Sequence, residues 1–175
     1  MTIIKESGMA FGDYDDKNLF KIENSSIHTL AGLNIKSVEF ILLNEHQKVN
    51  NVIILEAKTS CPNPIVEDTP DEKKKKYEEF FSDITDKFTD SINMFAATIL
   101  NRYRDKSEIG EELRRTVLED KYKMLLVLVI SSAEESWLQG PRAELERRLL
   151  KMRQIWKCEV LVINKEIAQQ KGLLV

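Results

Sequence analysis

Short apolar runs separated by polar segments predict three strands in the first third of the chain. LFKIE at 19–23 is the weakest of them, VEFILL at 38–43 is stronger, and VIILEAK at 52–58 is almost continuously apolar. A β-branched run of this kind is typical of a strand buried on both faces. The polar stretch between the second and third runs indicates an antiparallel hairpin, and we expect the lead-in before residue 19 to be helical or irregular.

The apolar positions change to a helical spacing beyond residue 72. Aromatic and aliphatic side chains then recur at steps of three and four and form one stripe along about seven turns. The stripe contains Tyr77, Phe80, Phe81, Ile84, Phe88, Ile92, Phe95, Ile99 and Tyr103. We therefore expect one long helix, separated from the third strand by an exposed linker that begins with Pro62 and Pro64.

A strand, a helix and a strand complete the pattern. KMLLVLVI at 123–130 predicts a central strand, and CEVLVIN at 158–164 predicts a further strand before a short closing helix. Between them, Gly140-Pro141 marks the start of a basic amphipathic helix, because proline is favourable at the first helical position. The apolar side of this helix contains Leu145, Leu149, Met152 and Trp156. This order implies an α/β fold with a mixed central sheet flanked by helices, in a single domain over residues 1–175.

The composition agrees with one globular domain. The chain has 175 residues, of which 42% are hydrophobic and 31% are charged, as in a typical folded protein. No apolar run reaches the ~18 residues that cross a bilayer, and the N-terminal segment lacks the apolar centre of a signal peptide. Cys61 and Cys158 lie far apart without metal-ligand spacing, so we expect reduced thiols and no zinc site. These observations favour a cytoplasmic location with no membrane partner.

Charge is distributed unevenly along the chain. A net charge of -3 argues weakly against nucleic-acid binding, because phosphate-binding domains often carry a positive excess. Basic residues nevertheless concentrate on the amphipathic helix, which makes Arg142, Arg147, Arg148 and Lys151 candidates for contacts with a nucleic-acid backbone. A solvated helix face is the alternative interpretation of the same series.

The expected hairpin brings acidic and basic residues together. Glu56 and Lys58 are two positions apart on one strand, so their side chains point to the same face. If the hairpin is symmetric about the midpoint between Gln47 and Lys48, Glu39 lies directly opposite Glu56, with Cβ atoms roughly 4.5 to 5.5 Å apart. A different register would turn Glu39 outward.

Two neighbouring carboxylates in an apolar hairpin need compensation, because burial and mutual repulsion both oppose their ionisation. Lys58 supplies one positive charge. A hard divalent ion such as Mg²⁺ would compensate both acids, and it prefers oxygen ligands of this type. Such an ion polarises a phosphate and lowers the pKa of bound water, while a lysine stabilises developing charge. This combination is the chemistry of phosphodiester hydrolysis.

Val38-Glu39-Phe40, followed by Ile54-Leu55-Glu56-Ala57-Lys58, resembles the PD-(D/E)XK nuclease superfamily, whose restriction-endonuclease-like fold has an αβββαβ core. The resemblance implies that Glu39 and Glu56 bind Mg²⁺ or Mn²⁺, with the backbone carbonyl of Ala57 as an additional ligand. It also implies that Lys58 orients the attacking water or stabilises charge. The chain departs from the family pattern because Glu39 replaces the more common aspartate and has no preceding proline. Glu6 is the candidate for the upstream helical glutamate of some members.

The sequence therefore predicts a Mg²⁺-dependent nuclease that hydrolyses phosphodiester bonds of DNA, in a setting such as defence or repair. The alternative is a catalytically inactive domain that keeps the fold as a protein- or nucleic-acid-binding scaffold, which the acidic net charge and the atypical Glu39 favour. A nucleotide-binding α/β domain is less supported, because the chain has no glycine-rich phosphate loop. A homodimer built on the long helix, the strandedness of the substrate and its sequence preference stay open.

Overall fold

The computed structural model describes residues 1–31, 34–46, 49–103, 107–116 and 122–175. Its central sheet is built from β3 (Leu19–Phe20), β4 (Phe40–His46), β5 (Val49–Lys58), β6 (Lys123–Ile130) and β7 (Glu159–Asn164). These five strands lie side by side in the order β3-β4-β5-β6-β7. The pairs β3-β4 and β4-β5 are antiparallel, whereas β5-β6 and β6-β7 are parallel. The expected mixed sheet is therefore confirmed, although its first strand is only two residues long.

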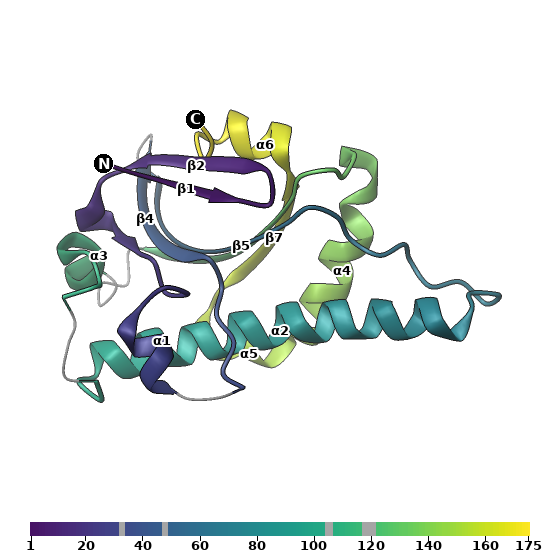
Figure 1. The fold of residues 1–175 in the computed structure, drawn as a ribbon, viewed down its shortest axis with the longest axis horizontal. Coiled ribbons are helices and arrows are strands. Elements are labelled where there is room, and N and C mark those ends of the chain that lie inside the picture. Colours follow the sequence, from purple (N-terminus) through teal and green to yellow (C-terminus); the bar gives the residue numbers. More distant parts are fainter. Residues whose placement is uncertain (32–33, 47–48, 104–106, 117–121) are drawn as a thin grey trace.

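Helices flank both faces of this sheet. They are α1 (Ser26–Ala31), α2 (Asp71–Ile99), α3 (Glu111–Thr116), α4 (Gln139–Arg148), α5 (Leu150–Trp156) and α6 (Lys165–Gln170), with short 3₁₀ helices at Asp16–Asn18 and Glu135–Trp137. α2 runs along one face, and α6 lies on the other (Figure 1). Within the described ranges, no helix combines the length and apolar character that a bilayer span requires.

β4 and β5 form the expected hairpin in the expected register. Phe40 pairs with Leu55, and the same register leaves Glu39 opposite Glu56 at the end of the ladder. The turn at 47–48 lies outside the described residues. The apolar side chains of β5 alternate between a core under α2 and a second core on the opposite face. This burial on both faces is what the continuous apolar run predicts.

α2 begins close to the expected position and ends earlier than the apolar stripe predicts. It starts at Asp71 and includes the lysine-rich segment, where Lys74, Lys75 and Lys76 each pair with an acidic residue of the same helix. It ends at Ile99, so Tyr103 lies beyond it. The buried side chains of the stripe are Phe81, Ile84, Phe88, Ile92 and Phe95. The stripe therefore packs on the sheet as expected, and local ion pairs accompany the exposed first turns.

The expected basic amphipathic helix is divided into α4 and α5. Leu149, at the junction, is buried and adopts φ -90° and ψ 12°, which interrupts the helical backbone. Leu145 and Met152 are buried on either side of it, whereas Trp156 is 36% exposed. The apolar side of this region therefore ends before the tryptophan.

The lead-in before residue 19 is a β-hairpin, not the helical or irregular segment that we expected. Two antiparallel strands form it, β1 (Thr2–Glu6) and β2 (Met9–Tyr14). Ser7 and Gly8 connect them with positive φ values of 49° and 73°, as a two-residue hairpin turn requires. Phe11 is fully buried, and its ring centroid lies 5.6 Å from that of Phe40. The hairpin thus covers the face of the sheet opposite α2 (Figure 1).

Candidate active site

Glu39, Glu56 and Lys58 lie together at the carboxyl end of β5. Lys58 Nζ is 3.0 Å from Glu56 Oε1. Glu39 stands one residue before β4, and its backbone N–H donates to the Leu55 carbonyl at 3.1 Å, which extends the hairpin ladder to this position. Glu56 is fully buried, and Glu39 is only 8% exposed. Both carboxyl groups therefore lie where ionisation is costly.

A second lysine, Lys87 from α2, also pairs with Glu56. Lys87 Nζ is 2.9 Å from Glu56 Oε1, so two ammonium groups share this oxygen. The other oxygen, Oε2, is buried and has no hydrogen-bond partner among the described residues. Burial raises the pKa of Glu56, and attraction to Lys87 and Lys58 opposes this rise without cancelling it. Burial would lower the pKa of Lys87, but attraction to Glu56 outweighs that effect and raises it.

Three carboxylates meet beside this pair. Glu6 ends β1, Glu23 follows β3, and Glu39 precedes β4; one oxygen of each lies within 4.8 Å of the others. Burial raises the pKa of Glu39 to about 8, assisted first by repulsion from Glu56 and then by the charge of Glu23. Glu23 also forms a hydrogen bond with Glu39, which further favours the protonated carboxyl. The carboxyl groups are therefore so crowded that Glu39 favours its neutral form up to about pH 8.

The donor set is suited to a hard divalent cation. Mg²⁺ and Mn²⁺ prefer carboxylate and carbonyl oxygens, and Glu6, Glu23 and Glu39 offer three such oxygens within a small space. With Glu56, four carboxyl groups lie in this region, and the two lysines that pair with Glu56 can compensate at most two negative charges. The Oε2 of Glu56 is one more buried oxygen without a hydrogen-bond partner among the described atoms, and its carboxylate pairs with Lys58 and Lys87 through Oε1. These features fit an oxygen-liganded metal ion.

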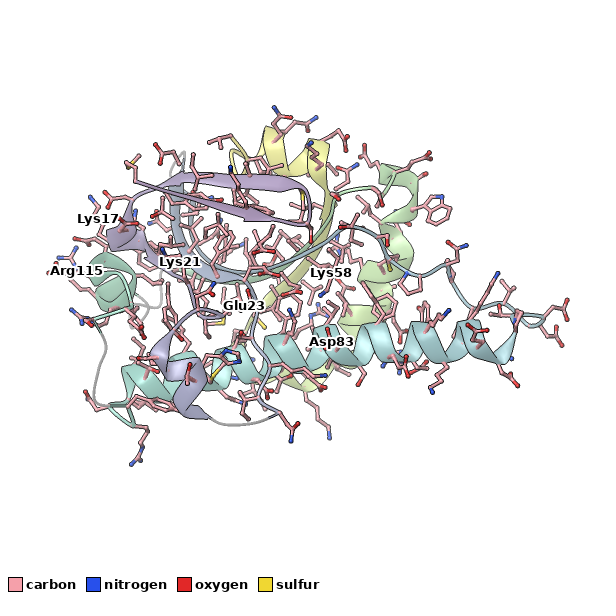
Figure 2. All side chains as sticks on the ribbon, viewed as in Figure 1. Lys17, Lys21, Glu23, Lys58, Asp83 and Arg115 are labelled. Atoms are coloured by element: carbon pink, nitrogen blue, oxygen red, sulfur yellow. The ribbon has the colours of Figure 1, made fainter. Side chains whose placement is uncertain are left out.

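Lys58 connects this cluster to α2. Its Nζ is 4.0 Å from Asp83 Oδ2, and Asp83 also pairs with Lys36 at 3.1 Å. Figure 2 shows Lys58 on the sheet and Asp83 on α2 facing each other, with Glu23 nearby. The side chain of Lys58 is 29% exposed. Lys58 is thus held by two acids and remains accessible from solvent.

The backbone carbonyl of Ala57, expected to be a further metal ligand, accepts a hydrogen bond from Ser7 Oγ at 3.1 Å. Ser7 belongs to the turn of the N-terminal hairpin, so this contact fixes the turn against β5. The hydrogen bond helps to place Glu6, the preceding residue, at the cluster.

The arginines expected to contact nucleic acid lie beside acidic residues. Arg142 pairs with Glu146, Arg147 pairs with Glu144, and Arg148 pairs with both Glu144 and Glu78. Lys151 is exposed on α5. The surface of α4 therefore carries mixed charge, and a nucleic-acid contact there stays a prediction.

Neither Glu23 nor Lys87 stands out in the sequence, and Glu6 was expected on a helix. Glu6 is instead the last residue of a strand. Glu23 follows the short strand β3, where no periodicity marks it. Lys87 sits between Ile84 and Phe88, two members of the buried stripe, and this position beside an apolar stripe is the one signal that could have singled it out.

Comparisons with protein-family models, with curated proteins and with solved structures gave no match for this chain. The relationship to a nuclease superfamily therefore stays a resemblance carried by the residues of the β4–β5 hairpin and their surroundings.

Proposed function

We propose that this chain is a metal-dependent nuclease that hydrolyses phosphodiester bonds of DNA, on a restriction-endonuclease-like core. One observation carries the proposal: the buried acids Glu39 and Glu56 face each other across a hairpin, with Lys58 paired to Glu56. Glu6 and Glu23 add two carboxylates at the same place. Two acids can hold a metal ion that activates water and polarises the phosphate, and a nearby lysine can stabilise the developing charge, so this arrangement is suited to hydrolysis of a phosphodiester.

Each residue has a role that follows from its surroundings. Glu39, Glu23 and Glu6, whose oxygens lie within 4.8 Å of one another, would hold Mg²⁺ or Mn²⁺. Glu56, which does not belong to this group of three, would add its free oxygen as a fourth ligand. When bound, the ion would polarise the phosphate and activate a water molecule. Lys58, partly exposed beside the cluster, would stabilise the negative charge that develops on the phosphate oxygens.

Lys87 has a positioning role in this proposal. From α2, Lys87 donates a hydrogen bond to Oε1 of Glu56. Oε2 has no hydrogen-bond partner among the described residues. The pairing of Lys87 also holds α2 against the end of β5. Lys58 and Lys87 thus differ in function, because the former is accessible and the latter is largely covered, with side-chain exposures of 29% and 14%.

The proposal is tested by incubating purified protein with labelled single- and double-stranded DNA in Mg²⁺ or Mn²⁺. We expect cleavage by the wild type, and a loss of at least about a hundredfold in rate for Glu56→Gln and for Lys58→Ala, since each removes a charge that acts on the transition state. Lys165→Ala, at an exposed position on α6, is the matched control and should cleave like the wild type. Wild-type protein that cleaves neither DNA nor RNA would refute the proposal.

The second candidate function is a non-catalytic scaffold that binds a protein or nucleic acid. The observation that favours it is the double pairing of Glu56, whose charge Lys58 and Lys87 already compensate. The same samples separate the two functions. A metal site should raise the melting temperature of the wild type on addition of Mn²⁺, because an ion that binds only the folded state stabilises it, whereas a scaffold should show no such shift.

A further inference from the structure

A cavity of about 380 Å³ lies beside the candidate active site, at the carboxyl ends of β5 and β6. The segment after β5 forms one wall, and the segment between β6 and α4 forms the other. Its lining includes Ser60, Cys61, Pro64, Ile130, Trp137 and Leu138. Ile130, which lines the cavity, pairs with Lys58 in the parallel register of β5 and β6. The cavity therefore lies at the same end of the sheet as Lys58.

Backbone contacts fix this cavity relative to Lys58. The backbone N–H of Ser131 donates to the carbonyl of Lys58 at 2.9 Å, and that of Ser132 donates to the carbonyl of Thr59 at 3.0 Å. Ser132 Oγ also donates to the Thr59 carbonyl at 2.6 Å. The wall that carries Trp137 is therefore attached to the chain that carries Lys58, so a molecule in the cavity would have a defined position relative to the lysine.

The lining has the chemistry that recognises a nucleobase. Trp137 lines the cavity and is 54% exposed. Its indole therefore offers a large aromatic surface to a ligand. Ser60 and Ser136 add hydroxyl groups that can donate to or accept from the edge of a base, whereas Ser132, whose proton goes to the Thr59 carbonyl, can only accept. A planar base stacks on an aromatic side chain and hydrogen-bonds through its edge, so both kinds of group would be used.

A second cavity, of about 570 Å³, continues from the first along the same segment and shares Cys61, Pro62 and Pro64 with it. Its lining carries Lys73 and Lys76 of α2 together with one acid, Asp68. Lys76 pairs with Glu72, but Lys73 is exposed and belongs to none of the ion pairs that hold the next three lysines. A nucleic-acid strand with one base in the first cavity would extend its phosphates toward these ammonium groups.

We propose that the cavity at Trp137 binds an unpaired nucleobase of a single-stranded nucleic acid, next to the phosphate at Lys58, and that Lys73 and Lys76 contact the adjoining backbone. A base stacked inside a duplex cannot enter such a cavity, which is why the substrate is single-stranded or locally unpaired. The inference rests on the proposed nuclease function for the reaction at Lys58. Binding in the cavity requires no cleavage and can be measured by itself.

The test measures the affinity of a fluorescein-labelled oligothymidylate of about ten nucleotides, a typical site size, for the full-length Glu56→Gln protein by fluorescence anisotropy. A duplex of the same length is the comparison. We expect the single strand to bind more tightly, and Trp137→Ala to weaken its binding by roughly ten- to a hundredfold, as the loss of one stacked base predicts. Trp137→Phe should retain most of the affinity. Trp156→Ala, which removes the other tryptophan, on α5, should bind like the parent.

A second set of variants tests the cavity and the backbone contact separately. Ser136→Leu, at an exposed wall position, fills part of the cavity without removing the indole and should also weaken binding. The double variant Lys73→Ala with Lys76→Ala should reduce the dependence of log affinity on log salt by about 0.7 for each phosphate that a lysine no longer neutralises. An unchanged salt dependence would overturn the proposed binding of the backbone by these lysines.

The outcomes for the cavity and for the nuclease are distinct. Equal affinity for single strand and duplex, or affinity that neither Trp137→Ala nor Ser136→Leu changes, overturns the base-binding cavity whatever the wild type cleaves. Binding of single strands that depends on Trp137, with no cleavage by the wild type in Mg²⁺ or Mn²⁺, supports the cavity and rejects the nuclease.

Discussion

Glu39 is the residue whose ionisation determines the charge of the carboxylate cluster. Burial, with repulsion from Glu56, raises its pKa to about 8 from a usual value of 4.5. Between pH 4.5 and pH 8 the folded protein therefore holds a proton at Glu39 that the unfolded chain has lost. The stability associated with this proton is fully present below pH 4.5 and is lost as the pH rises through 8. A cation bound by the cluster would relieve the same repulsion and lower the pKa of Glu39.

Glu39→Gln should reveal this pH dependence, because glutamine has the shape of the protonated side chain and no charge. At about pH 9 we expect the variant to be more stable than the wild type by roughly 1–3 kcal/mol, and near pH 5 we expect the two to be similar, since one pKa unit corresponds to about 1.4 kcal/mol. Urea unfolding at both pH values measures the difference. Glu67→Gln, in the exposed linker, is the control. A stability difference that is the same under both conditions would contradict the raised pKa of Glu39.

At the scale of elements, the contact between β5 and α2 depends on a buried ion pair as well as on apolar packing. Lys87 reaches the fully buried Glu56 from a helix that begins 13 residues after β5 ends, at Asp71. Removing one partner of a buried pair leaves the other charge uncompensated, which usually costs more than the pair itself contributes. Lys58 stays in contact with Glu56, so part of the compensation would remain.

Lys87→Met should lower the free energy of unfolding by about 2 kcal/mol, less than the ~3–5 kcal/mol typical of a fully broken buried pair, because Lys58 remains. Adding Glu56→Gln should recover part of this loss, since the charge that lacks its partner is then gone. Denaturant titrations of the wild type, both single variants and the double variant give the coupling energy. Independent, additive effects of the two substitutions would show that the ion pair does not stabilise the packing of α2 against β5.

Elements with a long, regular pattern could be predicted from the sequence, whereas contacts between elements could not. The apolar run of β5 and the polar turn before it were sufficient to give the register that places Glu39 opposite Glu56. The N-terminal hairpin was missed because its strands, TIIKE and MAFGDY, are short and neither alternates strictly between apolar and polar residues, which is the signal that indicates a strand. Lys87 and Glu23 were missed because their partners are distant in sequence, and only the folded chain brings them together.

At the scale of the molecule, the candidate active site combines residues from both layers that cover the sheet. α2 contributes Lys87 from one face, and the N-terminal hairpin contributes Glu6 from the other. Phe11 and Tyr14 anchor this hairpin on Phe40, and Ser7 ties its turn to the Ala57 carbonyl. The hairpin is therefore more than a cover for the second core, because it also places a carboxylate at the cluster.

Glu6→Gln tests whether this placement matters for the metal ion. Glu6 is only partly buried, so the substitution should leave the stability of the metal-free protein nearly unchanged. It removes one of the four carboxylates proposed as ligands, and we expect the affinity for Mn²⁺ to fall about tenfold, or ~1.4 kcal/mol. Isothermal titration of Mn²⁺ into both proteins at about pH 8.5, where a larger fraction of Glu39 is ionised, measures the change, with Glu159→Gln on β7 as the control. If the affinity of Glu6→Gln equals that of the wild type, the ion is held by Glu23, Glu39 and Glu56 alone, and the hairpin contributes to the molecule only by packing.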